Sequence, residues 1–174
     1  QNAGSNTVQQ VAYALAHANE YFNKFGGAIS NNIQFNFAFG SNYFFEIAKI
    51  RAFRYLLDLV LAEYNIKADI QIFAEPSFRN KTIYCSHINL MRSTSENMSA
   101  ILGGSNTIAN SDFDSIFESE NENNTSLNQL LLLKEDISLR NPQQITTDCY
   151  YIEAITKQIT EKALIIFKEI EKGG

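Results

Sequence analysis

Residues 83–114 (IYCSHINLMRSTSENMSAILGGSNTIANSDFD) constrain the fold of this chain more than any other stretch, because they combine a helix, a helix stop and a strand. Four apolar residues at helical spacing predict one apolar face on the helix. They are Met91, Met98, Ile101 and Leu102. Gly103-Gly104 is typical of a helix end, and residues 107–109 (TIA) then predict a short strand followed by Asn110, Ser111 and Asp112. A helix that leads into a strand is one unit of an α/β fold.

The remaining segments repeat this alternation of helix and strand. Residues 32–39 (NIQFNFAF) alternate apolar and polar side chains, residues 68–75 (ADIQIFAE) stop at Pro76, and both predict strands. Helices are predicted from Ser5 or Asn6 to Phe25, from a cap at Ser41 to about Tyr64, from Ser126 to about Ile137, and from about Tyr150 to a stop at Gly173. This order predicts a parallel sheet with crossover helices. A complete eight-stranded α/β barrel takes about 250 residues, so three strands could form only part of one.

Composition narrows the class of protein and its partners. At 174 residues, with 45% hydrophobic and 19% charged residues, the sequence fits one soluble domain with a core. Its 14 basic residues are spread among 19 acidic ones, so no patch for a nucleic acid backbone is expected. No apolar run reaches the roughly 18 residues of a membrane span, and no leader segment is expected. Cys85 and Cys149 are too few and too far apart for a disulfide framework, which makes a reducing cytoplasm the expected location.

Residue chemistry alone predicts neither a catalytic residue nor a metal site. His17 and His87 are the only histidines, and a structural or surface role is expected for each. Cys85 and His87 could offer two metal ligands, but a tetrahedral site needs at least one or two more. The sequence contains no Gly-x-Ser-x-Gly elbow, no phosphate loop of the Gly-x-x-x-x-Gly-Lys type and no Gly-x-Gly-x-x-Gly turn. These observations predict an α/β domain without a visible catalytic set.

Four long segments, in order, resemble the barrel domain of the adenosylcobalamin-dependent methylmalonyl-CoA mutase family. They are QNAG with the VQQVAYALAHANEYF that follows, NYFFEIAKIRAFRYL, NLMRSTSENMSAILGGSNTI and YYIEAITKQITEKALIIFKEIEKGG. The resemblance runs nearly end to end. It implies that residues 1–174 form the C-terminal half of a TIM (β/α)8 barrel, with three parallel strands and flanking helices. It also implies that the chain contains no cobalamin-binding domain.

The chain departs from the catalytic subunit of the family at positions that face the substrate. Where that subunit carries Arg-Thr-His-Ser-Gln-Thr-Ser-Gly for the acyl-CoA chain, residues 71–78 read QIFAEPSF. The degenerate CoA-facing positions are therefore Gln71, Phe73 and Ala74. Gln71 replaces an arginine and so removes a charge-assisted contact with a CoA phosphate.

The cofactor and catalytic motifs of the family also lack counterparts. The active-site Tyr-His pair would lie before Gln1, and neither His17 nor His87 fits the cobalamin-binding Asp-x-His-x-x-Gly signature. The resemblance therefore implies that this chain carries no catalytic residue and binds no cofactor itself. Adenosylcobalamin would belong to the family holoenzyme.

The first functional hypothesis is a segment of the non-catalytic small subunit of a methylmalonyl-CoA mutase, an isomerase of propionate metabolism. The resemblance implies that this subunit forms a heterodimer with a large catalytic subunit, which interconverts methylmalonyl-CoA and succinyl-CoA. A second hypothesis is the truncated catalytic barrel of an active acyl-CoA mutase. A third is an unrelated α/β binding module.

Three parallel strands cannot close a barrel, so two sheet edges need partners. The apolar inward faces of residues 32–39 and 68–75 are also expected to be left uncovered. Either the remainder of the parent barrel or a second copy of the fragment could cover them. The remainder of the barrel is favoured, because a homodimer would need both edges to be self-complementary by accident.

Overall fold

The computed structural model describes residues 2–110, 124–136, 139 and 145–173. The elements are, in order, α1 (Thr7–Phe25), the 3-10 helix η1 (Gly26–Asn32), β1 (Gln34–Phe39), α2 (Tyr43–Glu63), β2 (Gln71–Pro76), the 3-10 helix η2 (Phe78–Asn80), α3 (Ser86–Gly103), β3 (Thr107–Ile108), α4 (Thr125–Glu135) and α6 (Tyr150–Gly173). The predicted alternation of helix and strand is confirmed. Ser111 and Asp112 lie outside the described residues.

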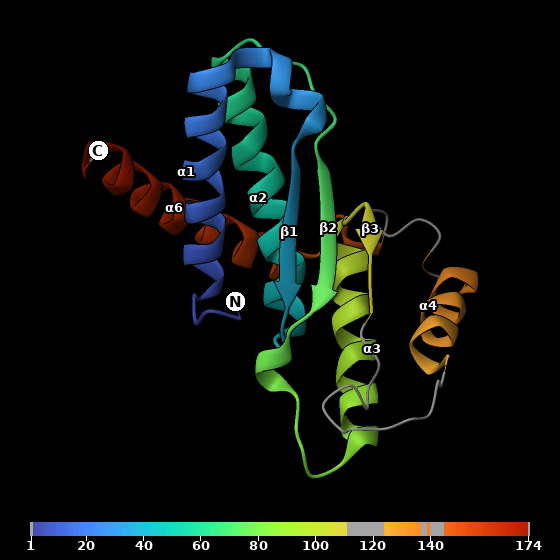
Figure 1. Ribbon diagram of the computed structural model, residues 1–174. Helices are drawn as coiled ribbons and strands as arrows, with labels where there is room; N and C mark the ends of the chain where they lie inside the picture. The colour runs from blue at the N-terminus through green and yellow to red at the C-terminus, as the bar shows by residue number, and fades with distance from the viewer. Residues whose placement is uncertain (1, 111–123, 137–138, 140–144, 174) are drawn as a thin grey trace.

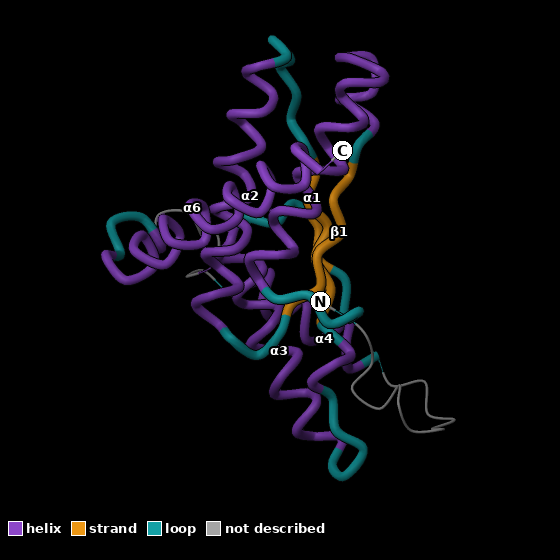
Figure 2. Tube along the Cα trace, turned by 90° about the vertical axis from the view of Figure 1, so that its left-hand side faces the viewer, coloured by secondary structure: helices purple, strands orange, loops and turns teal. Residues whose placement is uncertain are grey.

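The three strands form one parallel sheet in the order β1, β2, β3 (Figure 1). Gln34 of β1 pairs with Gln71 of β2, and Phe73 of β2 pairs with Thr107 of β3. The long helices α2 and α6 lie on one side of the strands (Figure 2). The prediction of an α/β fold with three parallel strands and flanking helices is therefore confirmed.

The apolar side chains of the strands point toward the helices. Phe35 and Phe37 of β1 both pack edge-on against Phe53 of α2, with ring centroids 4.8 and 4.9 Å apart. The register pairs these two residues with Ile72 and Ala74 of β2, which are buried on the same face. The core thus lies between the sheet and its helices.

The opposite face of the sheet is mostly polar, and we refer to it as the open face. Its residues are Gln34, Asn36 and Ala38 of β1, Gln71, Phe73 and Glu75 of β2, and Thr107 of β3. Gln34, Asn36 and Gln71 are exposed, whereas Phe73 and Glu75 are partly buried. The expectation of uncovered apolar faces is therefore wrong. The period of two along each strand places the aromatic residues under α2 and leaves amides on the other side.

Several predicted boundaries differ from the observed ones, among them the start of the first strand, which is Gln34 and not residue 32. The second strand begins at Gln71, not at residue 68, because its partner strand begins only at Gln34, after η1. The residue that caps α2 is Asn42 in place of Ser41, and its side chain makes no capping hydrogen bond. By contrast, α1 has a complete capping box between Asn6 and Gln9.

The predicted apolar face of α3 is wrong for the first half of the helix. Met91 is 73% exposed, and the buried residues in this half are polar. Asn89 and Ser93 are the buried residues of this half, and the polar residues Glu96, Asn97 and Ser99 are buried further along the helix. The end of the helix is as expected, because Gly104 adopts a left-handed conformation with φ of 88°.

Helix α6 packs across α1 and α2 and completes the core. The apolar stripe expected along this helix is buried over its first part, at Ile152, Ile155, Ile159 and Ala163, whereas Ile170 near its end is exposed. Arg51 of α2 donates to the carbonyl of Thr146 at 2.8 Å and forms an ion pair with Glu153 of α6. In the part of the chain that the structure describes, no helix is long and apolar enough to cross a lipid bilayer.

Candidate functional site

Two adjoining cavities open where β1 and β2 end. The first, of about 380 Å³, lies between the N-terminal ends of α1 and α2. The second, of about 590 Å³, lies along the loop from β2 to α3. Both are lined by Ser41, Arg79 and Asn80, and we call the pair the carboxyl-end hollow. Parallel α/β proteins bind their ligands at the carboxyl ends of the strands, so this hollow is the candidate site.

A buried ion pair supports the first cavity. Lys49 of α2 is 0% exposed and forms an ion pair with Glu46, one turn earlier on the helix. Its ammonium group also donates to Gln10 of α1 at 3.1 Å and to the carbonyl of Ala38 in β1 at 2.8 Å. The same ammonium lies 4.6 Å from the centre of the Phe39 ring. One side chain thus joins α1, β1 and α2 where they meet the hollow.

The environment of Lys49 acts on its pKa in two directions. Burial lowers the pKa of the ammonium group, because the charged form loses water. The charge of Glu46 and a hydrogen bond from Lys49 to its carboxylate oppose this shift. Glu46 therefore favours the charged form of Lys49, which burial alone disfavours.

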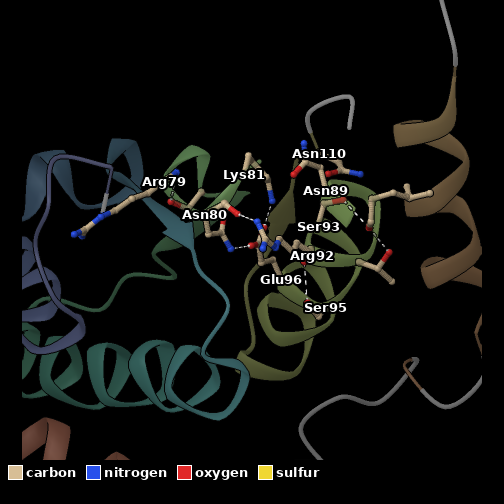
Figure 3. Close-up of polar contacts among 12 residues, drawn as sticks. Arg79, Asn80, Lys81, Asn89, Arg92, Ser93, Ser95, Glu96 and Asn110 are labelled. Carbon is tan, nitrogen blue, oxygen red and sulfur yellow. Dashed lines mark hydrogen bonds and ion pairs between the residues drawn. The ribbon is translucent and has the colours of Figure 1, made fainter. Parts of the chain in front are cut away.

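Three side chains of α3 hold the loop that lines the second cavity (Figure 3). Asn89 accepts a hydrogen bond from the amide of Thr82 at 2.8 Å and donates to its carbonyl at 2.9 Å. Arg92 donates to the carbonyl of Asn80. Glu96 forms an ion pair with Lys81 at 2.6 Å and accepts a hydrogen bond from the side chain of Asn80. The spacing 89, 92, 96 puts these three side chains on one face of the helix.

Glu96 is 0% exposed, and its carboxyl group contacts Asn80 and Lys81 of the loop that lines the second cavity. Burial raises the pKa of Glu96, while its hydrogen bonds with Lys81 and Asn80 act in the opposite direction. The nearby carboxylate of Glu46 adds to the rise. The carboxylate of Glu46 in α2 therefore contributes to the raised pKa of Glu96 in α3.

We expect Glu96→Gln to change how stability depends on pH. A carboxyl group with a raised pKa binds more protons in the folded state than in the unfolded state. Its contribution to stability is complete below the unfolded pKa of about 4.3 and is lost as pH rises through the folded pKa. The free energy of unfolding of the unchanged protein should therefore fall more steeply with rising pH above about 4.3 than that of Glu96→Gln.

Urea titrations at a series of pH values would measure this difference. Glu161→Gln is the matched control, because Glu161 is exposed on α6 and forms no ion pair among the described residues. The control should keep the slope of the unchanged protein. A Glu96→Gln variant with that same slope would contradict the expectation.

A second polar contact attaches α4 to α3. The side-chain amide of Gln129 donates to the carbonyl of Leu90 at 3.0 Å and accepts from the hydroxyl of Ser93 at 3.3 Å. Asn110, which follows β3 as predicted, also donates to Gln129. Gln129 is the one buried residue among those of α4. The polar face of α3 is therefore explained by two sets of hydrogen-bonding partners, the loop and α4.

The structure separates the three predicted CoA-facing residues. Gln71 and Phe73 lie on the open face, whereas Ala74 is 0% exposed on the face that the helices cover. All three belong to β2, but alternation along the strand places Ala74 on the other side. None of them lines the carboxyl-end hollow.

The predicted histidines and cysteines are scattered. His17 and His87 are exposed, and neither lines the hollow. Cys85 immediately precedes α3 and Cys149 immediately precedes α6, and both are free thiols. Among the residues that the structure describes, no three His, Cys, Asp or Glu side chains are grouped in a way that could hold a metal ion.

Sequence reasoning missed the residues that line and support the hollow. A signal for them exists in the polar residues of α3, which recur at helical spacing at Asn89, Ser93 and Glu96. A polar stripe of this kind needs hydrogen-bonding partners once it is buried. Thr82 of the loop is the partner of Asn89, and Asn80 and Lys81 are the partners of Glu96. Gln129 of α4 is the partner of Ser93.

The fold and the hollow define an α/β protein built from consecutive strand–helix units, with its candidate site at the carboxyl ends of parallel strands. A family model for methylmalonyl-CoA mutase matches residues 1–174. The chain belongs to the methylmalonyl-CoA mutase family.

Curated relatives of the chain include subunits of two kinds of mutase. The methylmalonyl-CoA mutase small subunit of Porphyromonas gingivalis is 36% identical, over 99% of this chain and 30% of the relative. Methylmalonyl-CoA mutase of Cereibacter sphaeroides is 28% identical, over 100% of this chain and 26% of the relative. The 2-hydroxyisobutanoyl-CoA mutase large subunit of Aquincola tertiaricarbonis is 25% identical, over 99% of this chain and 33% of the relative. The chain thus spans about a third or less of the length of these relatives.

Proposed function

We propose that this chain is a barrel segment of the non-catalytic small subunit of a methylmalonyl-CoA mutase. The chemistry of the open face is the observation that carries this proposal. Among the described strand residues, this face presents no lysine or arginine, and its one charged side chain is the carboxylate of Glu75. An acyl-CoA carries several phosphate charges, which such a face would repel instead of pairing. The 36% identity with a small subunit supports the same proposal.

The remainder of the parent barrel and a large catalytic subunit are the proposed partners. The strand order leaves one edge of β1 and one edge of β3 without a partner strand in the described chain. Consecutive strand–helix units that advance by one position around a sheet are the building pattern of a closed barrel. Further strands of the same protein would pair with these two edges. A second copy of this segment is the less favoured occupant.

We propose that adenosylcobalamin is held outside this segment. A protein ligand to the cobalt in this family is expected from the Asp-x-His-x-x-Gly signature, and neither histidine of this chain stands in such a sequence. His17 and His87 are also exposed and do not line the hollow. The described residues therefore do not fit the group, and no chemical step is assigned to them.

Co-expression of the full-length protein with a large mutase subunit would test this proposal. We expect the two to co-purify and the complex to interconvert methylmalonyl-CoA and succinyl-CoA. We expect the full-length protein alone to show no isomerisation and no change in the visible spectrum of added cobalamin. Isomerisation by this protein without a partner would favour the alternative of an active catalytic barrel.

A further inference from the structure

The second cavity of the carboxyl-end hollow is lined by a local concentration of positive charge. Three of its lining residues are cationic, namely Arg79, Lys81 and Arg92, and no carboxylate is among them. The chain as a whole has 19 acidic and 14 basic residues and is therefore negatively charged, whereas the lining of this cavity is positively charged. The open face of the sheet, in contrast, presents only Glu75 as a charged strand residue.

Two of these cations lack an acidic partner. Lys81 is paired with Glu96. Arg92 donates to the backbone carbonyl of Asn80, which is a neutral acceptor. In the described chain, neither Arg79 nor Arg92 forms an ion pair with a carboxylate. An uncompensated guanidinium at a cavity is available to a carboxylate or a phosphate, which its planar fork fits with two hydrogen bonds.

Hydrogen bonds from α3 hold the loop that carries these cations, although the side chain of Arg79 is itself exposed. Asn89 fixes both backbone groups of Thr82, and Glu96 binds Asn80 and Lys81 together. Figure 3 shows Lys81 and Arg92 gathered around Glu96, while Arg79 extends from the same loop in another direction. Because Arg79 lines both cavities, the positive groups are distributed along the hollow. Such a preorganised arrangement lowers the ordering cost of binding.

Apolar surface adjoins the cations. Ile83 and Tyr84 line the second cavity, and Tyr84 is 92% exposed. A large exposed aromatic side chain next to basic groups offers a contact for the organic part of a ligand. We propose that the carboxyl-end hollow binds a small organic anion, with Arg79 and Arg92 pairing its phosphate or carboxylate groups and Tyr84 contacting its organic part. This site is independent of whether the protein is catalytic.

Calorimetric titration of the full-length protein with pyrophosphate, ADP and succinate would test the site. Pyrophosphate and ADP represent phosphate ligands, and succinate represents a carboxylate ligand. We expect saturable binding of at least one probe, and the probe that binds identifies the anionic group. Arg79→Gln should weaken that binding about 10- to 100-fold, which is the effect of losing a hydrogen bond to a charged group. If ADP binds, Tyr84→Ala should weaken ADP binding and leave pyrophosphate binding unchanged.

Lys157→Gln is the matched control, because Lys157 is exposed on α6 and does not line the hollow. It removes the same charge from the protein as Arg79→Gln. Arg79 is itself exposed and forms no ion pair in the described chain, so its variant should keep the melting temperature of the unchanged protein. Two results would overturn the proposal. One is the lack of saturable binding of all three probes at millimolar concentration, and the other is an equal loss of binding in the Lys157→Gln control.

Discussion

Replacing Lys49 with alanine is expected to lower the free energy of unfolding by about 3–5 kcal/mol. The substitution leaves the carboxylate of Glu46 in a site where that residue is only 2% exposed. Removing one partner of a buried ion pair is costly because the remaining charge has lost both its water and its counter-charge. The substitution also removes the hydrogen bonds to Gln10 and to the carbonyl of Ala38, which join α1 and β1 to α2.

Urea denaturation of three variants would separate two effects on the free energy of unfolding. One is the cost of burying Glu46 without the charge of Lys49, and the other is the net contribution of the ion pair. Lys49→Ala should be strongly destabilised, and the double variant Glu46→Leu with Lys49→Met should recover much of the loss. Replacing both partners with apolar residues of similar size is often neutral or stabilising, which is the reason for this expectation. Lys67→Ala, at an exposed position, is the control. If the double variant were no more stable than Lys49→Ala, the loss of the counter-charge of Glu46 would not be the cause.

Ile159→Ala in α6 is expected to cost about 2–5 kcal/mol of unfolding free energy. Ile159 is buried at the crossing of α6 with α1 and α2, so the truncation leaves a cavity that the surrounding helices cannot fill completely. Thermal or chemical denaturation would measure the loss. Asp58→Ala is the control, because Asp58 is exposed on α2 and should produce no measurable change. Similar losses in the two variants would mean that the packed faces of these helices are misassigned.

The sequence allowed the elements with strong periodicity to be predicted. In α6 the apolar residues repeat at 3.6-residue spacing, and in β1 each aromatic residue is followed or preceded by a polar residue or by Ala38. In both cases the pattern records burial against one continuous apolar surface, which is the situation that periodicity rules describe. The residues at which strands begin were harder to predict. The start of β2 depends on where its partner strand begins, and local sequence does not contain that information.

The buried face of α3 could not be predicted from apolar spacing. This helix packs its first half against a polar loop and against Gln129 of α4, so its buried side chains are chosen for hydrogen bonding. Met91 satisfies a helical apolar pattern and yet is exposed. Burial of polar residues becomes predictable only once their partners are known, and the partners of Asn89, Ser93 and Glu96 outside α3 lie 7 to 36 positions away in the sequence.

The candidate site was hidden for a different reason. Overall charge averages over the whole chain, and 19 acidic residues conceal the local group formed by Arg79, Lys81 and Arg92. The family resemblance drew attention to residues 71–78 as a linear motif. Strand geometry then divides that motif between two faces of the sheet, with Gln71 and Phe73 on one side and Ala74 on the other.

The polar open face also affects how this segment could behave during synthesis on the ribosome. The apolar strand residues on the other face, such as Phe37 and Ile72, are covered by helices of the same segment, so they do not have to wait for distant strands to be made. Exposed apolar surface in unfinished proteins promotes aggregation, whereas exposed amides such as those of Gln34, Asn36 and Gln71 remain hydrated. A partly synthesised protein could therefore carry this segment in a folded form while its sheet edges are still unpaired. Its polar open face would then be at low risk of aggregation.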